Sequence, residues 1–288
     1  AMKAHWSEHP DRDEAWAEAE KARIGTERFR REHECEFLIF DETLISSTQL
    51  VEMEGNEPMQ TMGQVRWWKK PDPKMTYMVA LDPAMGTGGD FAAIQVFELP
   101  TFEQVGEWHH NTTPMNQQVR ILQSITKHIN DSMLEQDSSA NPSIFYSMEN
   151  NTVGEAALLR VMDIGEENIH GQFLSEPIRK GHRRKFRRGF NTTAKHKIDA
   201  CTKFKELIEN NKMVINSKPL ISELKDFVAT GVSFKAKPGQ HDDLVSACLI
   251  MTRMMKVLAD FDPKIFEKWT NRDGDYTAPM PIFANLGI

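Results

Sequence analysis

Residues 76–98 are the stretch that most restricts how this chain can fold. An apolar run ends on Asp82, the small-residue turn PAMGTGG follows, and a second acid, Asp90, precedes another apolar run from Phe91 to Phe97. Two such runs around a glycine-rich turn predict a β-hairpin with a carboxylate at the end of a buried strand. An acid there is costly to bury unless it meets a cation. Asp82 is therefore either an ordinary turn cap or a metal ligand.

Length and composition limit the other possibilities. The chain has 288 residues, 40% of them hydrophobic, and a net charge of −7, so any contact with nucleic acid must come from a local basic patch. Three scattered cysteines, Cys35, Cys201 and Cys248, form no CxxC pair and indicate a reducing compartment. We expect no membrane span, because no apolar run approaches about 18 residues, and no secretory signal, because the N-terminus is polar.

The order of the expected elements indicates the fold class. Residues 11–34 have helical character and 35–75 look irregular, so we expect a lead-in over 1–72, a compact domain over 73–262 and a tail over 263–288. After the hairpin, further strands are expected at Gln104 to His110, at Ser143 to Met148, in MVINS and in GVSFKAKPGQ. Helices are expected over 115–135, from VGEAALLRVM, from an N-cap at Thr192 or Thr193, in PLISELKDFVA and from HDDLVSACLI to the tail. This order predicts an α/β domain whose mixed central sheet carries helices on its faces.

Acidic residues lie where three of these elements begin or end. Asp82 ends the first strand, Glu149 follows the fourth, and Asp242 and Asp243 start the last helix. If the first and fourth strands are neighbours, Asp82 and Glu149 share one edge of the sheet. Clustered carboxylates hold Mg²⁺ or Mn²⁺. Two such ions about 3.5–4 Å apart can clamp a phosphodiester.

Each acid also has a simpler interpretation. Strand ends often carry acids for solubility, and Asp242 and Asp243 would also favour the positive end of a helix dipole. His241, just before them, is either a ligand or general acid, or a histidine on a surface turn. The case for a metal centre depends on the acids occurring together in this order.

A basic run and one lysine are the candidate contacts for nucleic acid. The segment RKGHRRKFRR at 179–188 lies between the candidate ligands, and it is either a phosphate contact or a solvated run of charge. Lys197, on the following helix, would reach a phosphate, neutralise the acids or lie on the surface. The candidate DNA-binding residues are Lys180, Arg183, Arg184, Lys185, Arg187, Arg188 and Lys197.

The glycine turn leaves one alternative open. DPAMGTGGD lacks the GxxxxGK[ST] of a phosphate-binding loop, and a strand rather than a helix follows it. The glycines would instead permit a tight turn close to metal or DNA. An acid before a Gly/Thr-rich hairpin also resembles the phosphate loop of actin-like ATPases.

Four segments together resemble a known family. MVALDPAMGTGGDFAAIQVF, SMENN, RRGFNTTAKHKIDACTKFKELIENNKMVI and GQHDDLVSACLI are similar to the C-terminal nuclease domain of the large terminase subunit of tailed bacteriophages, most of all the myovirus type. HPDRDEAWAEAEKARIGTERFRREHECEFL resembles the segment that joins the motor to the nuclease. The resemblance extends from about residue 5 to 260. It implies a ribonuclease-H-like fold of the resolvase and retroviral-integrase type, with helices on both faces of the sheet.

The resemblance also implies roles for individual residues. The family's acidic triad corresponds to Asp82, Glu149 and an acid of the HDD motif, for which we favour Asp243 with Asp242 assisting. Asp90 matches a supporting acid after the glycine turn. Resolvase-like relatives carry a further Asp where this chain has Ser246, so that ligand is absent.

The function implied is a Mg²⁺- or Mn²⁺-dependent DNA endonuclease that cuts concatemeric phage DNA by a two-metal mechanism. Its expected partners are double-stranded DNA, the ATPase motor domain of the same protein, the portal and the small terminase subunit, without membrane. It would act in the bacterial host cytoplasm, at the procapsid. The alternative is a DNA-binding clamp of the packaging motor with weak or silent cleavage; an actin-like ATPase fits the chain less well.

Overall fold

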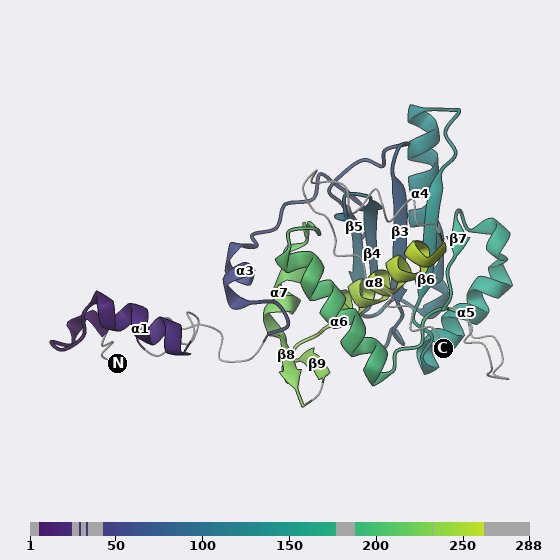
Figure 1. Cartoon of the computed structure of the whole chain (residues 1–288). Helices are drawn as coiled ribbons and strands as arrows, with labels where there is room; N and C mark the ends of the chain where they lie inside the picture. Colours follow the sequence, from purple (N-terminus) through teal and green to yellow (C-terminus); the bar gives the residue numbers. More distant parts are fainter. Residues whose placement is uncertain are drawn as a thin grey trace, which may run out of the picture.

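The computed structural model describes residues 6–24, 29, 33, 43–176, 188–231 and 233–261 (Figure 1). Its strands are β1 (Gln60–Met62), β2 (Val65–Trp67), β3 (Thr76–Asp82), β4 (Ala92–Leu99), β5 (Glu103–His110), β6 (Ser143–Met148), β7 (Gln172–Phe173), β8 (Phe227–Thr230) and β9 (Ser233–Ala236). Its α-helices are α1 (Glu14–Ile24), α3 (Ser47–Glu52), α4 (Met115–Gln136), α5 (Thr152–Ile164), α6 (Ala194–Glu209), α7 (Lys218–Asp226) and α8 (Asp243–Phe261), with short 3₁₀ turns at Trp6–Glu8 and Glu166–Asn168.

The main sheet is mixed, as predicted. Its strands run in the order β1-β2-β5-β4-β3-β6-β7, while β8 and β9 form a separate hairpin. β3 and β4 are the expected antiparallel hairpin, and β6 lies parallel to β3. The first and fourth predicted strands are therefore neighbours, which is the condition for Asp82 and Glu149 to meet.

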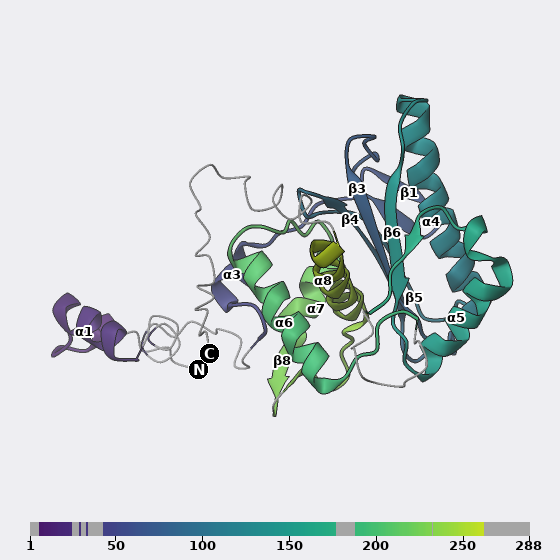
Figure 2. The same ribbon diagram turned by 45° about the vertical axis from the view of Figure 1, so that its right-hand side comes forward.

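Helices cover both faces of this sheet, which Figure 2 shows nearly edge-on. Residues along β3 alternate between the faces. Met78 and Ala80 join the core under α6, α7 and α8, whereas Tyr77, Val79 and Leu81 join the core under α4 and α5. Helix α8 contacts β3, β4 and β6, so it crosses the sheet near the end of β3.

Two sequence expectations need correction. Residues 35–75 looked irregular, but β1 and β2 extend the sheet and α3 packs on α7, so the sheet begins before the boundary expected at Pro73. The run MVINS contributes only an isolated bridge between Val214 and Glu103. Strands as short as β1 and β2 depend on a distant partner rather than on local pattern. The expected tail over 263–288 lies outside the described residues.

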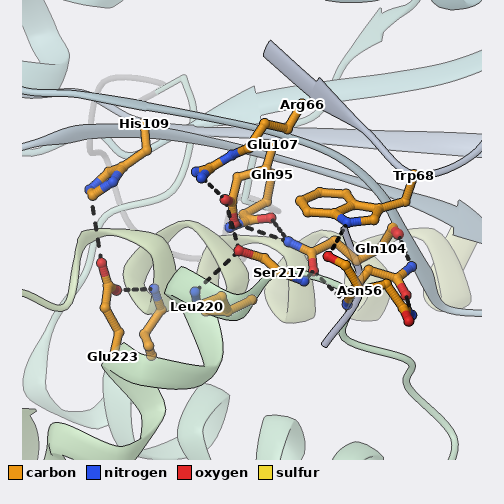
Figure 3. Close-up of polar contacts among 12 residues, drawn as sticks. Asn56, Arg66, Trp68, Gln95, Gln104, Glu107, His109, Ser217, Leu220 and Glu223 are labelled. Carbon is orange, nitrogen blue, oxygen red and sulfur yellow. Dashed lines mark hydrogen bonds and ion pairs between the residues drawn. The ribbon is translucent and has the colours of Figure 1, made fainter. Parts of the chain in front are cut away.

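A buried polar network fixes α7 against the sheet (Figure 3). Glu107 on β5 is fully buried, accepts from Gln95 Nε2 at 2.9 Å and from Ser217 Oγ at 2.8 Å, and pairs with Arg66 at 2.5 Å. Ser217 also caps α7 by accepting from Leu220 N. The network therefore holds the start of α7 over β5.

Within the described residues no helix has the length and apolarity that a membrane crossing needs.

Candidate metal centre

The strand order brings Asp82 and Glu149 to one edge of the sheet. Leu81 pairs with Met148 across the parallel strands, and Glu149 N donates to Leu81 O at 3.1 Å. Asp82 has the same parity as Met78 and Ala80, so its side chain belongs to the face that α8 covers. Both carboxylates are therefore placed by strand register beside the beginning of α8.

Helix α8 supplies the other two acids. It begins at Asp243, directly after Asp242. The Asp242 carbonyl accepts from Ser246 N at 2.7 Å, while its carboxylate accepts from Ala236 N at 3.3 Å. Phe91 N, at the start of the second hairpin strand, donates to the Asp243 carboxylate. Asp242 and Asp243 thus connect the start of α8 to the β8–β9 hairpin and to the end of the glycine turn.

The four acids are close enough to affect one another's ionisation. Burial raises the pKa of Asp82 well above its usual value, and Glu149, then Asp243 and Asp242, raise it further. Burial, followed by Asp242, raises the pKa of Asp243 to about 6. Asp243 Oδ2 is buried and has no hydrogen-bond partner within the described residues. These four carboxylates offer only oxygen ligands and carry more negative charge than the neighbouring cations neutralise. Such a cluster is suited to binding a hard divalent cation.

Asn151 and Gly154 position Glu149. Asn151 Nδ2 donates to Glu149 Oε2 at 2.5 Å, and its Oδ1 accepts from Gly154 N at 2.7 Å as the N-cap of α5. A Cβ on Gly154 would lie 1.9 Å from Glu149 O, so only glycine allows α5 this close to the end of β6. Asn151 lies in the SMENN motif, but the sequence predicted no role for it or for Gly154.

Lys197 lies beside the acids. Its Nζ is 3.5 Å from Asp242 Oδ2, so in this structure it neutralises part of the cluster. Thr193 is the N-cap of α6, which carries Lys197. A small pocket of about 80 Å³ continues from Glu149 along α6 and α8 and is lined in part by Thr192, His196, Lys197 and Arg253. Cationic groups therefore border the acidic centre on this side.

The glycine turn is tied to the connection between β5 and α4. Gly86 has a φ of +70°, and a Cβ there would meet Thr113 O at 2.3 Å. Gly88 N donates to Asn111 O at 2.9 Å. Asp90, after the turn, is exposed, and its charge contributes to the raised pKa of Asp243. His241 is half-exposed, with its Nδ1 3.5 Å from Asp243 Oδ2.

Of the basic run at 179–188, the structure describes Arg188. Lys180, Arg183, Arg184, Lys185 and Arg187 lie outside the described residues. Arg188 pairs with Glu166 and lies over the Phe173 ring at 5.1 Å, so it is engaged within the protein.

Two residues beside the centre were missed from the sequence. His109 on β5 and Glu223 on α7 are half-buried near Asp243, and the partial burial lowers the pKa of His109 to about 4 and raises that of Glu223 to about 9. In the sequence His109 is part of an ordinary strand and Glu223 of an amphipathic helix. The one sequence feature that could have indicated a site here is the pair of adjacent histidines at the end of β5.

A mixed sheet with helices on both faces and acids at the ends of β3 and β6 defines the ribonuclease-H-like class. The family model of the terminase ribonuclease-H-like domain matches residues 79–254, and the chain belongs to this family. The family resemblance drawn from the sequence is confirmed.

Solved structures agree with this fold. The large terminase nuclease of thermophilic phage G20c, solved with bound cobalt, is 15% identical with a TM-score of 0.54, over 74% of this chain and 97% of that chain. The large terminase nuclease domain of Thermus phage P74-26 is 16% identical with a TM-score of 0.50, over 73% and 93%.

Proposed function

We propose that this domain is a metal-dependent endonuclease that hydrolyses phosphodiester bonds of concatemeric phage DNA during packaging. The observation that carries the proposal is the cluster of Asp82, Glu149, Asp242 and Asp243, which three separate elements bring together. Family membership supports it. So does the G20c nuclease, which was solved with magnesium and with cobalt.

The carboxylates would bind two Mg²⁺ or Mn²⁺ ions, which activate water and stabilise the leaving oxygen when bound. Asp82 interacts with all three other acids, so it would be a central ligand for the ions. Glu149 and Asp243 would be the other main ligands, with Asp242 and Asp90 in support. Asn151 keeps Glu149 oriented.

Positive charge around the centre would hold the DNA backbone. Lys197 and the basic residues Lys180, Arg183, Arg184, Lys185, Arg187 and Arg188 are the proposed contacts. Since phosphate contacts position DNA without specifying sequence, we expect little sequence preference. In the full-length protein an ATPase motor domain, the portal and the small terminase subunit would be partners, at the procapsid in the bacterial cytoplasm.

Plasmid nicking tests the proposal. The purified domain should nick supercoiled DNA with Mg²⁺ or Mn²⁺ and not with EDTA. Asp82→Asn and Glu149→Gln should each lower the rate by about a hundredfold or more, corresponding to at least ~2.7 kcal/mol of transition-state stabilisation. Asp163→Asn is the control, because Asp163 is an exposed acid paired with Arg160 on α5.

Undiminished cutting by Asp82→Asn would contradict the proposal. Salt-sensitive DNA binding by the wild-type domain without cleavage under any divalent metal would favour the clamp alternative.

A further inference from the structure

A second group of metal-ligating side chains adjoins the acidic cluster. His109 from β5, Glu223 from α7 and Asp243 from α8 place one ligand atom each within 4.8 Å of one another. Figure 3 shows His109 pointing from the sheet toward Glu223. The proposed nuclease chemistry uses Asp243 but neither of the other two.

Strand register explains why His109 lies here. Asp82 pairs with Ala93 on β4, and Ala93 pairs with His109 on β5, so the three occupy one rung of the sheet. With strands about 4.8 Å apart, His109 lies roughly 10 Å from Asp82 along that rung. The small side chain of Ala93 between them leaves room for Asp243 to reach the rung from α8. The group formed by His109, Glu223 and Asp243 is therefore adjacent to the carboxylate centre, but it lies nearer to β5 than to β3.

The orientations of Glu223 and His109 are fixed by other contacts. Glu223 Oε2 accepts from Val245 N at 3.1 Å, which leaves Oε1 facing His109 Nε2 at 3.8 Å, beyond hydrogen-bond distance. The His109 ring stacks on Phe91, with centroids 4.2 Å apart. Both ligand atoms are thus held toward the same point without bonding to each other.

Two atoms of the group lack hydrogen-bond partners. His109 Nε2 and Asp243 Oδ2 are buried and have no hydrogen-bond partner within the described residues. Buried polar atoms are almost always satisfied, so each unpaired atom requires an explanation. A cation between them would satisfy both. His241 Nδ1 is 3.5 Å from Asp243 Oδ2 and faces the group from its exposed side.

We propose that His109, Glu223 and Asp243 form a separate binding site for a borderline divalent cation of the zinc and cobalt type. One imidazole with two carboxylates is a donor set that such ions accept, whereas Mg²⁺ prefers oxygen alone. Ligands around zinc at about 2.0–2.1 Å lie roughly 3.4 Å apart, so a small side-chain rotation closes the site. Through Asp243 the cation joins the sheet, α7 and α8 at the border of the carboxylate centre.

Cobalt binding tests this site without relying on nuclease activity. The EDTA-treated, dialysed domain is titrated with CoCl₂ by calorimetry and by visible absorption, which reports the coordination geometry of bound Co²⁺. We expect His109→Asn and Glu223→Gln each to weaken one Co²⁺ binding event at least tenfold and to remove its absorption signal. Glu223→Gln retains an acceptor for Val245 N, so it preserves the fold if His109→Asn does not.

Two controls separate this site from the carboxylate centre. His110→Asn changes the adjacent histidine, whose Nδ1 contacts Thr113 Oγ1 at 2.6 Å outside the group. The Asp82→Asn/Glu149→Gln double variant removes the carboxylate pair, and both controls should retain the histidine-dependent signal. Unchanged binding in both His109→Asn and Glu223→Gln overturns the proposal, as does a signal lost only in the double variant. A domain that binds cobalt this way but nicks no DNA would refute the nuclease function and leave this site standing.

Discussion

Asp243 is the residue that the two proposed metal sites share. It starts α8, shares the carboxylate cluster with Asp82, and faces His109 and Glu223 on its other side. Its pKa of about 6, against a usual 3.8, follows first from burial and then from Asp242. In a metal-free protein its charge is therefore unfavourable, and a bound cation would remove that penalty.

The raised pKa predicts a pH-dependent stability of the metal-free protein. Because the folded pKa lies above the unfolded one, the native state binds more protons between about pH 4 and 6, so stability falls as pH rises through that window. Asp243→Asn should thus stabilise the domain at pH 7 by roughly 1–2 kcal/mol, allowing for solvent screening, and by little at pH 4. Urea unfolding in EDTA measures this. An effect equal at all pH values would contradict it.

Asn151 has two functions that substitutions can separate. Asn151→Ala removes both the N-cap of α5 and the bond to Glu149, so it should cost about 1 kcal/mol and lower nicking about tenfold. Asn151→Ser keeps a capping oxygen but is too short to reach Glu149. It should recover stability without activity, as measured by urea unfolding and by the Mn²⁺ dependence of nicking. Full activity in the serine variant would show that Asn151 acts only as a cap.

At the scale of elements, the centre depends on how closely α5 and α8 approach the strand ends. The N-terminus of α5 lies directly on the backbone after β6, and α8 crosses β3, β4 and β6. The buried network around Glu107 fixes α7, which in turn holds α8 through Glu223 and Val245 N.

Gly154→Ala tests the approach of α5. The new Cβ would fall 1.9 Å from Glu149 O, so α5 must shift, at a cost of roughly 1–3 kcal/mol, and Glu149 must move with it. Thermal unfolding should show the lower stability and nicking should fall in parallel. Gly89→Ala is the stability control, because a Cβ there meets nothing within 4 Å. Equal stability of the two variants would contradict the close approach of α5.

At the scale of the whole molecule, a net charge of −7 must be reconciled with DNA as the proposed substrate. Lys197 is placed beside the centre but is partly neutralised by Asp242, and Arg188 pairs with Glu166. The predicted phosphate contacts therefore depend mainly on the other basic residues of the run at 179–188.

Replacing that run predicts a change in salt dependence. Changing Lys180, Arg183, Arg184, Lys185 and Arg187 to Gln should weaken DNA binding. The slope of log K against log salt should become shallower by about 0.9 for each phosphate that the variant no longer neutralises. Fluorescence anisotropy at several salt concentrations measures both quantities. An unchanged slope would place the DNA-binding surface elsewhere.

The sequence alone determined the local elements. Alternating and apolar runs with glycine turns predicted the β3–β4 hairpin, the exact span of β6, and α4 and α8, because these patterns reflect burial along a single segment. The same patterns placed Asp82, Glu149 and Asp243 at the ends of elements. They failed for β1 and β2, which are too short to carry a period and depend on β5.

Only the tertiary structure decided which of these ends meet. The parallel pairing of β3 with β6 and the packing of α8 across the sheet join residues that lie far apart in the sequence, and such contacts depend on packing of the whole domain. The same packing brought Lys197 to Asp242 and placed His109 and Glu223 on the other side of Asp243. No local pattern encodes these contacts, because each side chain fits its own strand or helix without them.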